Sequence, residues 1–206
     1  RLWDESDHAR RPRFDVPEVA RADLTQAFLI LNVLHQANSF QWLQKPSDDA
    51  RIRGLHVLED LGCLKKDSSK GREPEHVTEL GREVGRLPVH PRLAILLIEG
   101  AKRGVLREVA VAAALLTERD PFRAGGERGG GPRDIIKSHV RSDIYEKVLL
   151  LQHFHATGTD VDASGLPPLH HGAARTVLRS ADQYFHLISQ KCGTRAADPP
   201  RVLREV

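Results

Sequence analysis

The chain has few groups that could cross-link it and few aromatic side chains. It contains two cysteines and no methionine among 206 residues, and aromatic residues make up 5% of it. Cys63 and Cys192 lie far apart and form no Cys-x-x-Cys pair, which excludes a framework of disulfides and suits a reducing compartment. We therefore expect a cytoplasmic protein. With 40% apolar residues, the composition favours a mostly α-helical fold of one or two domains.

Long apolar runs and nucleotide-binding motifs are also absent. No run of 18 apolar residues occurs, so we expect no membrane-spanning helix. No Gly-x-x-x-x-Gly-Lys-Ser/Thr motif occurs, so the chain cannot be a P-loop motor by itself. No nucleophile elbow or Ser/His/Asp order indicates catalysis, and we expect no catalytic residue. Because the chain starts at Arg1 and lacks methionine, we expect an internal piece of a longer protein.

Apolar residues at helical spacing predict a succession of helices. Leucine and phenylalanine recur every three or four residues in a helix expected over 22–37. The segment 105–118 is apolar on nearly every side, which predicts a helix buried all round. The other helices are expected at 48–61, 91–103, 143–155 and 172–190.

A small β-hairpin is expected between two of these helices. Two short β-prone pieces near 63–64 and 76–77 flank a polar turn at 67–72. The resulting order of helix, helix, hairpin and helix is that of a winged-helix module.

Prolines define a sharp corner after the hairpin. Thr78 is a good N-cap, with Glu79 in the first turn of a short helix. Pro88 ends that helix by forcing Leu87 out of the α region, and Pro91 starts the next helix. We expect two helices to meet here at a fixed angle.

Positive charge is concentrated in residues 119–141. This segment holds six cations against three anions, so its charge equals the +3 of the whole chain. Several cations on a glycine-rich segment could contact the phosphates of a nucleic acid. The alternative is a solvated charged loop that binds nothing. The candidate phosphate-binding residues are Arg119, Arg123, Arg128, Arg133, Lys137 and Arg141.

Histidine pairs invite a metal hypothesis, which we do not adopt. His153 and His155 are two residues apart on an expected helix, so they point to different sides. Neither this pair nor His170 with His171 has a cysteine nearby. We expect surface histidines and no metal site.

Taken in order, several stretches resemble one family, the bacterial DEAH-box ATP-dependent helicases, and within it the HrpB type. The resemblance covers about 1–190 and lies in the region that follows the second motor domain. Each stretch is weak alone, and their order and spacing make the match specific. The matching stretches are 1–8 (Arg-Leu-Trp), 17–24 (Pro-Glu-Val-Ala-Arg-Ala-Asp-Leu), 42–46 (Trp-Leu-Gln-Lys-Pro), 58–64, 78–94 (with Leu-Pro-Val-His-Pro-Arg-Leu-Ala), 115–122 (Leu-Leu-Thr-Glu-Arg-Asp-Pro-Phe) and 172–179.

The resemblance implies a division of labour within a helicase. Residues 1–15 would end the second RecA-like domain, 16–88 would form the winged helix, and 89–190 a helical, ratchet-like bundle with its Gly/Arg-rich loop at 123–141. Residues 191–206 would link to a further C-terminal domain. ATP and Mg²⁺ would bind in the motor domains, so no cofactor is expected in this chain. The implied partners are single-stranded RNA or DNA and the chain's own RecA-like domains, with no membrane.

Two other functions compete with this one. The chain could be a winged-helix and helical module that binds protein partners, or only braces a motor, without touching nucleic acid. A free-standing winged-helix transcription factor needs a basic recognition helix. The expected helix 48–61 carries Arg51 and Arg53 against four acidic residues, which argues against that function.

Overall fold

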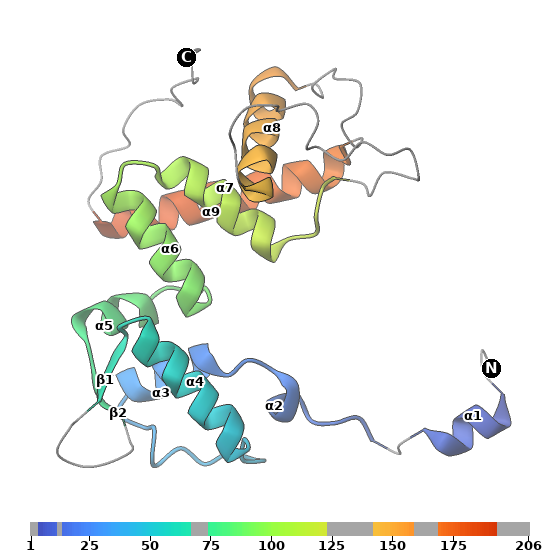
Figure 1. Ribbon diagram of the computed structural model, residues 1–206, viewed down its shortest axis with the longest axis vertical. Coiled ribbons are helices and arrows are strands. Elements are labelled where there is room, and N and C mark those ends of the chain that lie inside the picture. The colour runs from blue at the N-terminus through green and yellow to red at the C-terminus, as the bar shows by residue number, and fades with distance from the viewer. Residues whose placement is uncertain (1–3, 12–13, 67–73, 123–141, 159–168, 193–206) are drawn as a thin grey trace. The chain divides into compact units, whose positions relative to one another are not determined.

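The fold is described from a computed structural model of the chain. The structure describes residues 4–11, 14–66, 74–122, 142–158 and 169–192. It divides into two compact units, unit 1 (Arg1–Pro91) and unit 2 (Arg92–Val206), each with its own helices (Figure 1). This division does not show what fold each unit has. The winged-helix and ratchet-like domains assigned from the sequence therefore remain predictions. The hairpin turn at 67–72 and the segments 123–141 and 193–206 lie outside the described residues.

Unit 1 consists of helices around a two-stranded sheet. Helix α3 (Thr25–Val33) packs on α4 (Asp48–Asp60) and on α5 (Glu79–Gly85). Strands β1 (Leu64–Lys66) and β2 (Pro74–Val77) pair antiparallel, and both lie against these helices (Figure 1). Two short helices without buried residues, α1 (Glu5–Arg10) and α2 (Glu18–Arg21), precede them. The order of helix, helix, hairpin and helix is confirmed, whereas the winged-helix fold stays a prediction.

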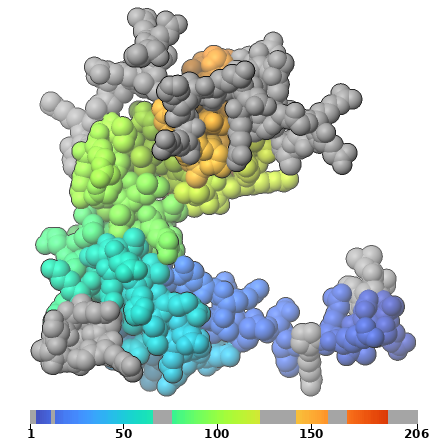
Figure 2. Space-filling view, viewed as in Figure 1, coloured from blue at the N-terminus to red at the C-terminus, as the bar shows by residue number. Residues whose placement is uncertain are grey.

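Helix α4 begins and ends where its local sequence predicts. The Ser47 hydroxyl accepts a hydrogen bond from the backbone N–H of Ala50 at 3.2 Å, which caps the helix. At the other end Gly62 adopts φ +71°, and the N–H of Cys63 donates to the carbonyl of Leu58 at 2.8 Å. This is a glycine-terminated Schellman motif. Figure 2 shows α4 at the surface of unit 1, in keeping with the exposed Ile52.

The corner between β2 and α5 is held by one threonine and one glycine. The Thr78 hydroxyl accepts from the N–H of Gly81 at 2.9 Å and donates to the carbonyl of Gly62 at 2.7 Å. The backbone N–H of Thr78 donates to the carbonyl of Cys63 at 3.0 Å. A Cβ on Gly81 would overlap that carbonyl oxygen, so only glycine fits. The predicted N-cap at Thr78 is therefore confirmed, and it also ties the end of α4 to the start of α5.

Unit 2 contains four helices in its described residues. They are α6 (Pro91–Lys102), α7 (Leu106–Thr117), α8 (Asp143–Thr157) and α9 (His171–Cys192). Helix α7 packs most extensively on α9, and α8 packs against both (Figure 1). Helix α6 begins at Pro91, as the sequence predicts, and approaches α7 closely. A Cβ on Gly100 would lie 2.9 Å from the Cβ of Val109, so this crossing depends on glycine.

Two predictions about helices are wrong. The apolar α7 is not buried all round, because Leu116 is 56% exposed and Val105, which precedes the helix, is 42% exposed. Ala110, Ala113 and Ala114 are buried, so the exposed apolar surface lies toward the two ends of the predicted helix. Helix α3 ends at Val33 instead of continuing to residue 37, because the N–H of Gln36 donates back to the carbonyl of Leu31. None of the described helices has the length and apolar character needed to cross a bilayer.

The end of α3 offers a test of backbone strain. His35 follows the C-terminal end of α3 and has φ +56°. The equivalent positions after α4 and α6 are occupied by Gly62 and Gly104, which also have positive φ. Side chains with a Cβ are disfavoured there, so His35→Gly is expected to raise the free energy of unfolding by about 1 kcal/mol. His35→Ala keeps the Cβ and is the control. Equal stability of the two variants in urea unfolding would contradict this account.

The Thr78 corner offers a second test. Thr78→Val keeps the side-chain shape and removes the hydrogen bonds of the hydroxyl to Gly62, Cys63 and Gly81, so we expect a loss of about 1 to 2 kcal/mol in the free energy of unfolding. Thr78→Ser keeps the hydroxyl and should lose much less. Thermal or urea unfolding of both variants checks this, and a valine variant as stable as the serine variant would show that the hydroxyl contributes nothing.

Candidate nucleic-acid interface

Of the six predicted phosphate-binding residues, the structure places one. Arg119 is exposed and follows the C-terminal end of α7. No ion pair to its guanidinium is found among the described residues. The other five, Arg123, Arg128, Arg133, Lys137 and Arg141, lie outside the described residues.

The acidic residues on either side of Arg119 anchor the segment that carries it. The carboxylate of Glu118 accepts a hydrogen bond from the Ser180 hydroxyl on α9 at 2.7 Å. The carboxylate of Asp120 accepts from the ammonium of Lys147 on α8 at 2.6 Å and from the N–H of Phe122 at 2.9 Å. Both acidic side chains are therefore engaged with unit 2 itself.

Backbone contacts complete this anchor. Pro121 is fully buried, and its carbonyl accepts from the N–H of His170 at 2.8 Å. Phe122 forms an isolated antiparallel bridge with Leu169. The Nδ1 of His170 accepts from the N–H of Ala173 at 3.1 Å, so this imidazole caps the start of α9. The segment 118–122 is thus fixed to both α8 and α9.

The electrostatics of the anchor favour an ionised Asp120. Partial burial acts to raise the pKa of this carboxyl, but the hydrogen bonds from Lys147 and from the N–H of Phe122 outweigh it and lower the pKa below its ordinary value. The carboxylate charge is largely matched by Lys147, which leaves the guanidinium of Arg119 able to meet a ligand anion. A guanidinium presents several N–H donors in a plane and suits phosphate oxygens.

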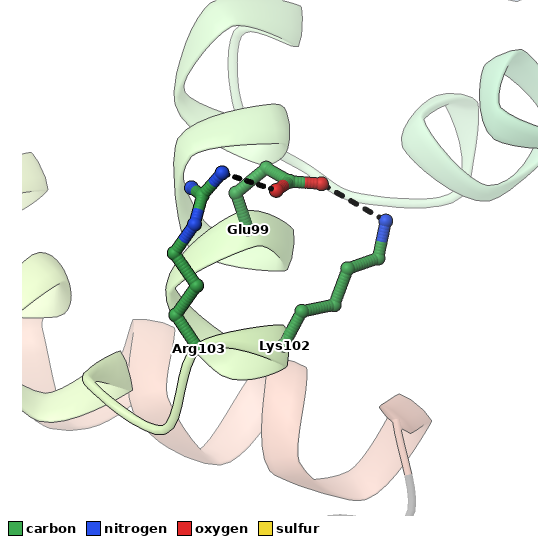
Figure 3. Close-up of polar contacts among 3 residues, drawn as sticks. All are labelled: Glu99, Lys102 and Arg103. Atoms are coloured by element: carbon green, nitrogen blue, oxygen red, sulfur yellow. Dashed lines mark hydrogen bonds and ion pairs between the residues drawn. The ribbon is translucent and has the colours of Figure 1, made fainter.

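Another pair of cations in unit 2 is less available. Near the end of α6, the carboxylate of Glu99 lies 2.9 Å from the Nζ of Lys102 and 3.2 Å from a guanidinium nitrogen of Arg103 (Figure 3). The hydrogen bond from Lys102 is the main cause that lowers the pKa of Glu99. All three side chains are well exposed, so these pairs contribute little to stability. They do reduce the net charge that this end of α6 offers to an anion.

Sequence reasoning missed a hollow between α7, α8 and α9. Its cavity volume is about 80 Å³, and it opens to solvent. Each helix contributes residues at spacings of three and four, which share one face. The lining combines apolar and polar side chains. The sequence spacings alone do not show that these three helices meet, so the hollow could not be predicted from them. The lining residues are Arg107, Ala110 and Val111 on α7, Gln152, His155 and Ala156 on α8, and Leu178, Ala181, Asp182 and Phe185 on α9.

The histidine pairs do not assemble a metal centre in the described part of the chain. No group of three or more histidine, cysteine, aspartate or glutamate side chains with suitable geometry occurs there. His171 instead packs its ring against Phe154, with 5.0 Å between centroids.

Comparison with known proteins finds one matching domain family. Residues 90–145 match the helicase associated domain (HA2), described as ratchet-like. This range holds α6, α7, the segment 118–122 and the start of α8. The relatives are named as ATP-dependent RNA helicases, so the chain is similar to one part of such helicases.

Three relatives illustrate the extent of the similarity. The ATP-dependent RNA helicase HrpA of Escherichia coli is 32% identical over 59% of this chain, and its homologue from Haemophilus influenzae is 30% identical over the same share. The probable ATP-dependent RNA helicase DHR2 of Saccharomyces cerevisiae is 32% identical over 80% of this chain. The chain spans 9% of the length of each of the first two and 23% of the third. These relatives do not confirm the HrpB type suggested by the motifs.

The Asp120–Lys147 bond gives a test of the anchor. A lowered pKa means that the bond stabilises the folded chain above the ordinary pKa of an aspartate, and that this contribution is lost as pH falls through the lowered value. Lys147→Met should raise the pKa of Asp120 toward its ordinary value and cost no more than about 1 kcal/mol of stability. Carboxyl NMR titration measures the pKa. Lys102→Met is the control and should leave Asp120 unchanged. An unaltered pKa in Lys147→Met would remove Lys147 as the cause.

Proposed function

We propose that this chain is an accessory region of an ATP-dependent DEAH-box helicase, in which unit 2 contacts single-stranded RNA or DNA and unit 1 braces the motor domains. The match of residues 90–145 to the ratchet-like helicase-associated domain carries this proposal. ATP and Mg²⁺ bind in motor domains outside this chain and supply the hydrolysis that drives opening and closing. The residues of this chain hold the strand and keep it in register with that motion.

Two finer assignments belong to the same proposal. Unit 1 is a winged helix over 16–88, which its order of helix, helix, hairpin and helix supports. The parent protein is of the HrpB type, which the order and spacing of the matching stretches support. RNA is favoured as the strand by the names of the HrpA and DHR2 relatives, and DNA stays open because another relative is named as a DNA/RNA helicase.

The geometry around Arg119 supports phosphate contact at this place. Its acidic neighbours, Glu118 and Asp120, bind Ser180 and Lys147 and so hold the segment in place. Arg119 itself is exposed and begins the stretch that holds the other five candidates. A cation on an anchored edge loses little conformational entropy on binding, which favours affinity. We propose that Arg119, Arg123, Arg128, Arg133, Lys137 and Arg141 neutralise successive phosphates.

Salt-dependent binding tests this function. Fluorescence anisotropy with labelled single-stranded RNA and DNA should show log affinity falling with log salt, with a slope of roughly −0.7 for each phosphate neutralised. Alanine at all six positions should remove most of the affinity and flatten the slope.

A charge-matched control separates these six residues from general attraction. It replaces six cations elsewhere, Arg10, Arg21, Arg51, Arg53, Lys102 and Arg103, and should keep most of the affinity. If both variants lose affinity to the same extent, the six predicted residues do not form a specific phosphate-binding site. If the unaltered chain shows no salt-sensitive binding at micromolar concentration, the competing function, a protein-interaction module or a brace alone, replaces this one.

A further inference from the structure

Two hydroxyl groups on α9 reach the end of α7, directly before Arg119. The Ser180 hydroxyl donates a hydrogen bond to the carboxylate of Glu118 at 2.7 Å. The hydroxyl oxygens of Tyr184 and Thr117 lie 3.2 Å apart. Ser180 and Tyr184 are four residues apart on one helix, so they share one face of it, and we call them the α9 hydroxyl pair. Their partners are the two residues that precede Arg119 in the sequence.

The direction of the bond to Thr117 follows from the other contacts of that residue. The Thr117 hydroxyl lies 3.2 Å from the carbonyl oxygens of both Ala113 and Ala114 in its own helix, and it donates there. A hydroxyl carries a single hydrogen, so the Thr117 oxygen accepts from Tyr184. Both members of the α9 hydroxyl pair are therefore donors, and both acceptors lie at the end of α7.

This attachment determines where the side chain of Arg119 points. At Glu118 the backbone changes from helical to extended, with φ −94° and ψ 169°. Successive side chains of an extended chain point to opposite sides. Because the Glu118 carboxylate is bound to α9, the side chain of Arg119 points away from α9, in agreement with its exposure. The α9 hydroxyl pair thus fixes the direction in which the guanidinium extends.

We propose that Ser180 and Tyr184 are positioning residues for Arg119, which hold its guanidinium outward before a strand binds. The inference rests on the proposed function, in which Arg119 neutralises a phosphate. A side chain that is already oriented loses less conformational entropy on binding than a mobile one, so the pair raises affinity without touching the strand. Both hydroxyls are uncharged, and their removal leaves the number of neutralised phosphates unchanged.

A double-mutant cycle in the 206-residue chain tests this role. The variant with Ser180→Ala and Tyr184→Phe loses both hydroxyls and no charge. It should bind a labelled single-stranded RNA about fivefold more weakly in fluorescence anisotropy. Its slope of log affinity against log salt should not change, whereas Arg119→Ala should reduce the slope by roughly 0.7. When Arg119 is already alanine, removal of the two hydroxyls should have no further effect on affinity.

The matched control removes one tyrosine hydroxyl and one aliphatic hydroxyl elsewhere in unit 2. It combines Tyr145→Phe on α8, where the tyrosine is 38% exposed, with Thr176→Ala on α9. The Thr176 hydroxyl donates to the carbonyl of Gly172 in its own helix. This control should bind the RNA like the unaltered chain. Thermal unfolding shows that each variant is folded before its binding is compared.

The outcomes distinguish the positioning role from the proposed function. If the variant without the α9 hydroxyl pair binds the RNA as tightly as the unaltered chain, the positioning role is wrong and the phosphate contacts stand. If it weakens binding equally with and without Arg119, or if the control weakens binding as much, the hydroxyls do not act through Arg119. If the unaltered chain shows no salt-sensitive binding, the proposed function fails, and the positioning role fails with it.

Discussion

The contact between α7 and α9 determines what unit 2 can present to a ligand. Small side chains make this contact: Ala113 and Ala114 on α7 and Ala174 on α9 are fully buried. Small residues let helix axes approach closely, so the position of one helix along the other is well defined. Because α7 is fixed in this way, its C-terminal end is held beside α9. There Glu118 reaches Ser180 on α9, and Arg119 is exposed next to it. Three other alanines, Ala110 on α7, Ala156 on α8 and Ala181 on α9, line the hollow between these helices.

Unit 1 depends in a similar way on one backbone position. The carbonyl of Cys63 accepts a hydrogen bond from the N–H of Thr78. It also lies so close to Gly81 that no side chain would fit between them. This brings the end of α4, the hairpin and the start of α5 to one point. The Cys63 thiol is fully buried, and this burial raises its pKa to about 11, so it is a packing group without thiolate reactivity. The mostly helical fold of the chain follows from such local junctions together with helix packing.

Local signals explain which parts of the fold could be predicted from sequence. The starts of α4, α5, α6 and α8 were predicted because caps and prolines act within a few residues. The end of α3 was missed because a histidine, rather than a glycine, adopts the reversing conformation at His35. The burial of α7 was overestimated because the sequence does not show how many neighbours a helix has.

Arg119 was found from charge alone, but its anchors could not be, since Lys147 and Ser180 are distant in sequence. The hollow depends on three helices meeting, which no local pattern encodes.

The phosphate contacts proposed for unit 2 would respond strongly to solution conditions. Such contacts release counterions and weaken steeply with salt, and they read no sequence. Because every phosphate offers the same contact, a strand held only through its phosphates can slide by one nucleotide without losing any of these interactions.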